Sequence, residues 1–253
     1  MISLNFKMIS TACMVFCMAC LSSCNVNSPV NNNPKVASLS PQTSNIPLLP
    51  KANLHAAALI NLQLALDYLN ENQFALAQRK LVLAEKQAPH LARVYIIKGY
   101  YYTLVDDLVS ADKAYQKALL LSHNSANTQN SYGVFLCRTG RYAEGIAAIR
   151  LAIKAPAFTQ SGLAYQNIGL CALKLKQLKL AQVSFEAALR YNPALTDPLY
   201  YLADINFKLK KYPQANQYLM QFLAHNQPTP EALKLKELLK RQQVELFVKN
   251  IDG

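Results

Sequence analysis

Cysteine thiols are the side chains of this chain with the most specific chemistry, because a thiolate can be acylated, oxidised to a disulfide or bound to a metal. Three of the six cysteines lie in an apolar run near the start of the chain, and Cys24 follows that run after two serines. The two others, Cys137 and Cys171, lie 34 residues apart in the second half. This distribution separates a candidate modification site near the N-terminus from a candidate pair of thiols in the body of the protein.

Catalytic motifs are missing from the sequence. It has no glycine-rich phosphate loop, no Gly-x-Ser-x-Gly turn and no His-Glu-x-x-His pair. His90 and His123 are 33 residues apart, but two histidines without a carboxylate make a poor metal site. We therefore expect no enzyme activity, no cofactor, no bound metal and no small-molecule substrate.

The N-terminal segment has the features of an export signal. Residues 1–23 carry one charge, Lys7, followed by the apolar run Met8 to Leu21, which is too short to span a membrane comfortably. Residues 21–24, Leu-Ser-Ser-Cys, resemble a bacterial lipobox, which predicts a lipoprotein signal peptide over 1–23, cleavage before Cys24 and a lipid on its thiol. The alternative is an ordinary secretory signal with an incidental cysteine.

Residues 24–53 are predicted to form the lipidated cysteine and a flexible tether. Five prolines lie among asparagines and serines there, with no sustained apolar period, so disorder is expected. As a coil the segment would span roughly 30 Å. By resemblance to sorted bacterial lipoproteins, Asn25 directly after Cys24 favours the outer membrane, with the protein on its periplasmic face.

The charge balance restricts the class of partner. Removal of residues 1–23 takes one lysine from the 26 basic residues, and the remaining 25 against 14 acidic residues give a net charge of +11. The basic residues are spread over helix faces and turns without the aromatic-basic motifs of a nucleic-acid reader. In an exported protein the expected partners are acidic protein surfaces, anionic lipid head groups or cell-wall polymer, and not nucleic acid.

Export also bears on Cys137 and Cys171. An oxidising compartment favours pairing of two thiols in a small domain. A disulfide between them would close a loop that stabilises the protein by about 3 to 4 kcal/mol in the chain-entropy model. The alternative is two buried free thiols that pack as small hydrophobic side chains.

The body of the chain repeats every 34 residues, which predicts how these side chains are positioned. Small residues recur with spacings of 34, 34, 36 and 34 at Ala65, Gly99, Gly133, Gly169 and Ala203. A second series follows the same spacing at Ala77, Ala111, Gly145, Ala181 and Ala215. Tandem helix-turn-helix units require such a period, since neither helix of one unit can bury its apolar face alone, and small residues fit where the two helices cross closely.

The repeat resembles the tetratricopeptide repeat, so an all-α tetratricopeptide-repeat solenoid is expected over 54–229. The fourth unit matches best, through Tyr165, Ile168, Gly169, Ala181, Phe185, Ala188 and Pro193. The second unit has His123 where a proline is expected. The five units are predicted at 58–91, 92–125, 126–159, 162–195 and 196–229, with turns at 71–72, 106–107, 139–140, 176–177 and 210–211.

A C-terminal capping helix is predicted over 230–253. Thr229, Pro230 and Glu231 place a capping hydroxyl, a first-turn proline and a carboxylate at its start. An open repeat stack needs such a cap over its last apolar face. The residues expected to cover it are Leu235, Leu238, Leu239, Val244 and Leu246.

A repeat stack without catalytic residues is expected to work through a protein-binding groove lined by the first helix of each unit. Side-chain amides there would bind an extended backbone, and aromatic side chains would offer apolar pockets. The groove residues predicted from the register are Arg93, Ile96, Tyr100, Asn127, Asn130, Val134, Arg138, Gln166, Leu170, Tyr200, Asp204 and Phe207.

Two stretches resemble a narrower family. The first stretch runs from Asn130 to Cys137 and is followed by Gly-Arg-Tyr at 140–142, and the second runs from Ala164 to Leu173. Both look like the corresponding parts of the type IV pilus biogenesis and stability lipoproteins PilW and PilF. The resemblance implies an outer-membrane lipoprotein that acts as a scaffold or pilotin for the pilus secretin, and a Cys137–Cys171 disulfide. The alternative is a repeat lipoprotein in outer-membrane barrel assembly, or an adaptor for cell-wall hydrolases.

Overall fold

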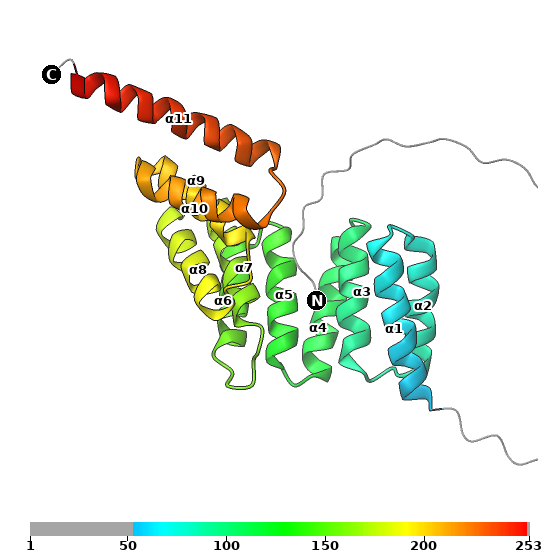
Figure 1. Cartoon of the computed structure of the whole chain (residues 1–253). Coiled ribbons are helices and arrows are strands. Elements are labelled where there is room, and N and C mark those ends of the chain that lie inside the picture. Colours follow the sequence, from blue (N-terminus) through cyan, green and yellow to red (C-terminus); the bar gives the residue numbers. More distant parts are fainter. Residues whose placement is uncertain (1–52, 252–253) are drawn as a thin grey trace, which may run out of the picture. The chain divides into compact units, whose positions relative to one another are not determined.

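The computed structural model describes residues 53–251, which form eleven α-helices and no strand (Figure 1). The predicted signal peptide, Cys24 and nearly all of the tether lie outside the described residues. None of the described helices is both long and apolar enough to cross a membrane. The helices are α1 (Leu54–Asn70), α2 (Phe74–Gln87), α3 (Ala92–Leu104), α4 (Leu108–Leu121), α5 (Ala126–Arg138), α6 (Tyr142–Ile153), α7 (Ser161–Lys174), α8 (Leu178–Tyr191), α9 (Asp197–Lys208), α10 (Tyr212–His225) and α11 (Pro230–Ile251).

The first ten helices pack in consecutive pairs, and each predicted unit holds one pair. The second helix of each unit also packs against the first helix of the next, which joins the units into a stack (Figure 1). Buried side chains such as Leu62, Ile149 and Phe185 lie between the helices of a pair and between successive pairs. The predicted all-α repeat solenoid is confirmed.

The turn within each unit has the same backbone conformation in all five units. Its central residue is left-handed, and the residue after it donates its backbone N–H to a carbonyl five residues back, at 2.8–2.9 Å. This arrangement ends a helix by satisfying one of its last carbonyls. The left-handed residues are Asn72 (φ 58°), Asp106 (φ 62°), Gly140 (φ 87°), Lys176 (φ 60°) and Lys210 (φ 58°).

The turn at the end of the second unit explains why His123 stands where the repeat pattern has a proline. His123 has φ 49° and Asn124 has φ 56°, and the N–H of Asn124 donates to the carbonyl of Leu119 at 2.9 Å. Proline is restricted to φ near −65°, so it cannot occupy position 123 in this turn. The departure from the repeat pattern is therefore a different turn conformation.

The third unit has its two helices in very close contact. A Cβ on Gly133 would lie 2.8 Å from the backbone oxygen of Gly145, and one on Gly145 would lie 2.7 Å from the oxygen of Gly133. Both distances are too short for a real contact, so each helix needs a residue without a side chain at the crossing. The prediction that small residues mark close helix crossings is confirmed here.

The C-terminal helix α11 covers the last unit over its first half. The hydroxyl of Thr229 accepts a hydrogen bond from the N–H of Ala232 at 3.2 Å, as the capping pattern predicts. Leu235 and Leu239 are buried against α9 and α10. Val244 is 63% exposed, so its predicted role in the cap is wrong. The helix is longer than α10, and position 244 lies beyond the length of helix that α10 can cover.

Candidate protein-binding surface

The first helices of successive units lie closer together than the second helices. Contacts join α1 to α3, α3 to α5 and α5 to α7, whereas within residues 53–251 no two successive second helices pack in this way. A stack that is tighter on one side bends toward that side. The first helices α1, α3, α5 and α7 therefore line the inner side of the bend, where the groove was predicted.

The predicted groove residues divide by exposure into three groups. Arg93, Asn127 and Arg138 are exposed. Val134 is only 6% exposed and Gln166 only 3%, so the prediction that these two side chains face a partner is wrong. Both residues lie on first helices, α5 and α7, that contact each other. The half-buried residues are Ile96, Tyr100, Asn130, Leu170, Tyr200, Asp204 and Phe207.

Several half-buried groove residues also support the core. Ile96 packs against the buried side chains of the first three units. Tyr200 and Phe207 pack against the terminal core, where the rings of Tyr200 and Phe222 are 5.7 Å apart. Burial and the carboxylates of Asp204 and Glu231 raise the pKa of Tyr200, so its hydroxyl stays protonated. Tyr200 and Phe207 each offer a partner only the exposed edge of the ring, because the rest of the ring is packed in the core.

Two side-chain amides, of Asn130 and Gln166, occupy equivalent positions in the third and fourth units, three residues before Gly133 and Gly169 respectively. The amide N–H of Gln166 donates to Asp197 at 3.3 Å, which fixes its carbonyl oxygen on the other side. That oxygen and the Oδ1 of Asn130 are buried and accept no hydrogen bond from the described part of the chain. An unpaired buried acceptor costs about 1–3 kcal/mol. If the half-buried Asn130 side chain rotates, its Oδ1 could accept a hydrogen bond from a bound chain, which would remove the cost for that oxygen.

A disulfide joins Cys137 on α5 to Cys171 on α7, with the two Cα atoms 5.6 Å apart. The bond ties the first helices of the third and fourth units together beneath the predicted groove. Cys171 is 2% exposed, so this end of the disulfide is shielded from solvent. Of the two alternatives for these residues, the structure contains the bonded pair.

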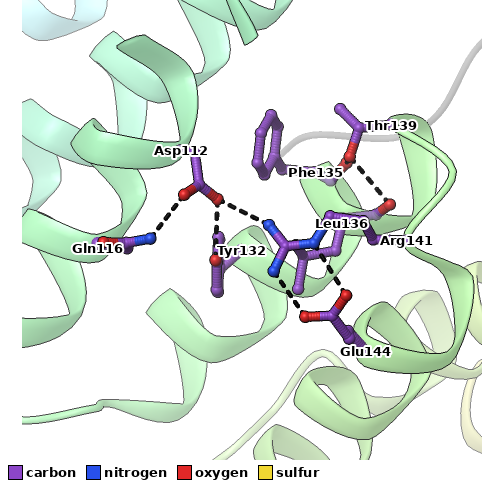
Figure 2. A network of polar contacts seen from close by, with 8 residues as sticks. All are labelled: Asp112, Gln116, Tyr132, Phe135, Leu136, Thr139, Arg141 and Glu144. Atoms are coloured by element: carbon purple, nitrogen blue, oxygen red, sulfur yellow. Dashed lines mark hydrogen bonds and ion pairs between the residues drawn. The ribbon is translucent and has the colours of Figure 1, made fainter. Parts of the chain in front are cut away.

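A polar network joins the second and third units (Figure 2). The carboxylate of Asp112 on α4 accepts hydrogen bonds from the Tyr132 hydroxyl at 2.9 Å, from Arg141 at 3.0 Å and from Gln116 at 2.6 Å. Arg141 also donates two hydrogen bonds to Glu144, at 2.9 and 2.6 Å. These hydrogen bonds lower the pKa of Glu144. The guanidinium thus bridges carboxylates from two neighbouring units.

Aromatic rings complete the contact between the second and third units. The ring of Tyr115 lies 5.0 Å from that of Phe135 and 6.0 Å from that of Tyr132. Burial raises the pKa of Tyr115. Tyr132, Phe135 and Arg141 all belong to the stretches that carried the narrower family resemblance, and they hold two units together.

The sequence did not reveal every member of this network. Arg141 and Glu144 are three residues apart at the start of a helix, a spacing that suggests a pair. Asp112 lies 29 residues from Arg141, and nothing in the sequence marks it as the partner. In the described part of the chain, no three His, Cys, Asp or Glu residues gather closely enough to hold a metal ion.

Comparison with known proteins agrees with the repeat architecture. A tetratricopeptide-repeat model matches residues 163–195, in the fourth unit. The type IV pilus assembly protein PilF of Pseudomonas aeruginosa is 28% identical over 157 residues, which cover 62% of this chain and 62% of PilF. An uncharacterized protein of Haemophilus influenzae is 27% identical over 134 residues, which cover 53% of this chain and 75% of that protein.

Solved structures give the same relation. The structure of Pseudomonas aeruginosa PilF matches with a TM-score of 0.69 at 26% identity, over 74% of this chain and 85% of PilF. PilW, described as a widely conserved type IV pilus biogenesis factor, matches with a TM-score of 0.67 at 24% identity, over 73% of this chain and 84% of PilW; this second likeness concerns the fold alone. The chain has the tetratricopeptide-repeat fold, is related at modest identity to the type IV pilus assembly protein PilF, and resembles PilW in fold.

Proposed function

We propose that this chain is a non-enzymatic scaffold of type IV pilus biogenesis. A lipid on Cys24 anchors it to the outer membrane on the periplasmic face, and its groove holds a segment of the pilus secretin. By doing so it promotes the localisation or multimerisation of the secretin and the stability of pili. The observation that carries the proposal is the relation to PilF in both sequence and fold.

The disulfide supports the location. Structural disulfides persist in oxidising compartments such as the bacterial periplasm and are rare in the cytosol. The Cys137–Cys171 bond is consistent with the export signal predicted over residues 1–23. The covalent link also holds two first helices in register, so that the groove is formed before the partner arrives.

The inner side of the bend supports a protein partner. Arg93 in the second unit and Asn127 and Arg138 in the third provide exposed polar groups. The half-buried Tyr100, Leu170 and Phe207 provide apolar edges in the second, fourth and fifth units. Extended segments bind such surfaces through backbone hydrogen bonds and side-chain pockets.

Deletion of the gene tests the proposal. We expect fewer surface pili and fewer secretin multimers in outer-membrane fractions, with both restored by the intact chain. Complementation with Cys24→Ala should leave the multimers low, whereas the matched variant Cys20→Ala, in the segment predicted to be removed, should restore them. Normal pili and normal multimers in the deletion strain contradict the proposal. Broad envelope defects without a pilus defect would indicate barrel assembly or cell-wall hydrolysis instead.

A further inference from the structure

The turn within each unit changes charge along the stack. In each unit we compare a segment of seven residues at the turn. It begins five residues after the recurring small residue of the first helix, which is Ala65, Gly99, Gly133, Gly169 or Ala203. The segment 70–76 carries one acid and 104–110 carries two, without a basic residue in either. The segment 138–144 carries two arginines and one glutamate. In contrast, 174–180 and 208–214 carry three lysines each and no acid.

The last two segments form what we call the basic edge, the turns of the fourth and fifth units. All six of its lysines are exposed: Lys174, Lys176, Lys179, Lys208, Lys210 and Lys211. Lys208 pairs with Asp204 at 2.6 Å. The other five have no ion-pair partner among the side chains that the structure describes, residues 53–244. The edge therefore carries an uncompensated positive field on two neighbouring turns.

The backbone of these turns adds a second, independent observation. Lys176 and Lys210 hold the left-handed conformation that Asn72, Asp106 and Gly140 hold in the other units. Glycine, asparagine and aspartate adopt this conformation readily, but lysine gains no local hydrogen bond from it and is strained there. The turn therefore gives no local reason for lysine at this position, although lysine occupies it in two successive units.

We propose that the basic edge is a contact site for the anionic head groups of a lipid surface. Lysine carries a compact, hydrated charge that attracts phosphate groups without requiring a fixed geometry. Specific protein–protein contacts more often use arginine and aromatic side chains. The edge contains no arginine, and Leu209, 40% exposed between lysines, can enter the head-group layer. The proposal does not depend on the identity of the protein partner.

Membrane contact at the basic edge would set the orientation of the stack. The turns project from the ends of the helix pairs, whereas the groove residues lie along the first helices. A stack that touches the membrane by the turns of its last two units keeps the inner side of its bend accessible. The anchor proposed at Cys24 alone would leave the orientation free.

Vesicle binding tests the contact site. The probes are vesicles of phosphatidylethanolamine with phosphatidylglycerol, compared with vesicles of phosphatidylcholine alone, at low salt. The basic-edge variant carries Lys174→Glu, Lys179→Glu and Lys211→Glu, which avoid the left-handed positions and the Lys208 ion pair. The control variant carries Arg79→Glu, Lys86→Glu and Lys113→Glu, which are exposed on α2 and α4 and change the net charge equally.

We expect the full-length wild-type chain to favour anionic vesicles by about tenfold or more, a preference that decreases as salt is added. The basic-edge variant should lose most of this preference, and the control variant should keep it. The N-terminal segment is the same in all three proteins, so its contribution cancels. Circular dichroism and thermal unfolding verify that each variant is folded. The proposal is overturned if the wild type shows no preference, or if both variants lose it equally.

Discussion

The centre of the stack and its C-terminal end are held together by different interactions. At the centre, a disulfide joins the third unit to the fourth, two glycines face each other within the third unit, and a network around Arg141 joins the third unit to the second. In the fifth unit, alanines occupy the equivalent crossing, and apolar contacts with α11 provide the stability. The interactions at the centre each require particular residues, namely two cysteines, two glycines and an arginine between carboxylates. The apolar contacts at the C-terminal end can be made by several kinds of apolar side chain. Function that requires a fixed groove belongs to the centre.

Removal of the disulfide should have the largest effect. The variant Cys137→Ser/Cys171→Ser loses the constraint on a 34-residue loop, and we expect a loss of about 3 to 4 kcal/mol in the free energy of unfolding. Chemical denaturation measures it, and the reduced wild type should match the double variant. A loss below about 1 kcal/mol would mean that the polar and apolar contacts alone hold the centre.

Truncation of the cap should come next. Leu239 is 1% exposed between α11 and the last unit, so Leu239→Ala should cost about 3 kcal/mol. The exposed Val244→Ala is the matched control and should cost little. Hydrogen exchange should show the loss in α9 and α10 while α5 and α7 remain protected. Equal loosening at the centre would contradict the division into two regions.

A methyl group at the central crossing should be the third largest effect. Gly145→Ala places its Cβ 2.7 Å from the backbone oxygen of Gly133, so α5 and α6 must move apart, and we expect a cost of about 2 kcal/mol. The equivalent position in the fifth unit is already an alanine, Ala215. Thermal unfolding measures the change. An unchanged midpoint would show that the crossing has room to adjust.

The two kinds of turn residue should respond in opposite directions. Gly140→Ala puts a side chain at φ 87°, and we expect a loss of about 1 kcal/mol. Lys210→Gly relieves strain at φ 58°, and we expect a gain of about 0.5 kcal/mol, less than the relief itself because glycine also gains freedom in the unfolded chain. The same denaturation experiment compares both. A loss in Lys210→Gly would show that the lysine side chain stabilises its turn.

Acid should weaken the network at the centre by the smallest amount. The hydrogen bonds from Arg141 lower the pKa of Glu144. Its contribution to stability is therefore complete above the pKa of an ordinary glutamate, and it is lost as the pH falls through the lowered value in the folded state. Comparison of wild type with Glu144→Gln between neutral and acidic pH measures it. The difference between the two proteins should vanish in acid; a constant difference would contradict the assignment.

The repeat positions predicted the fold because they report packing. Gly133 and Gly145 recur in phase with the other small residues, and a residue without a side chain has few other uses in a helix. The turns were predicted because they recur at the same place in each 34-residue unit, although Gly140 is the one glycine among their five left-handed residues. The left-handed conformation of Lys176 could not be predicted from its residue type, because it follows from the repeat position alone.

The candidate site was predictable only in outline. The register placed Asn127 and Arg138 correctly on an exposed side of α5, but Val134, on the same helix, is buried by the neighbouring unit. The distance between successive first helices decides this, and one sequence does not contain that distance. The partnership of Asp112 with Arg141 is hidden for the same reason, since it depends on how two units stack.

Site-specific photo-crosslinking in living cells tests the central claim most directly, that the inner side of the bend holds a pilus secretin segment. A photoreactive residue at the exposed Asn127 on α5 should give a crosslink to the secretin. The same residue at Leu151, which is 57% exposed on the second helix α6, should give none. Crosslinks to the secretin from Leu151 alone, or crosslinks from Asn127 only to proteins unrelated to pili, would contradict the account.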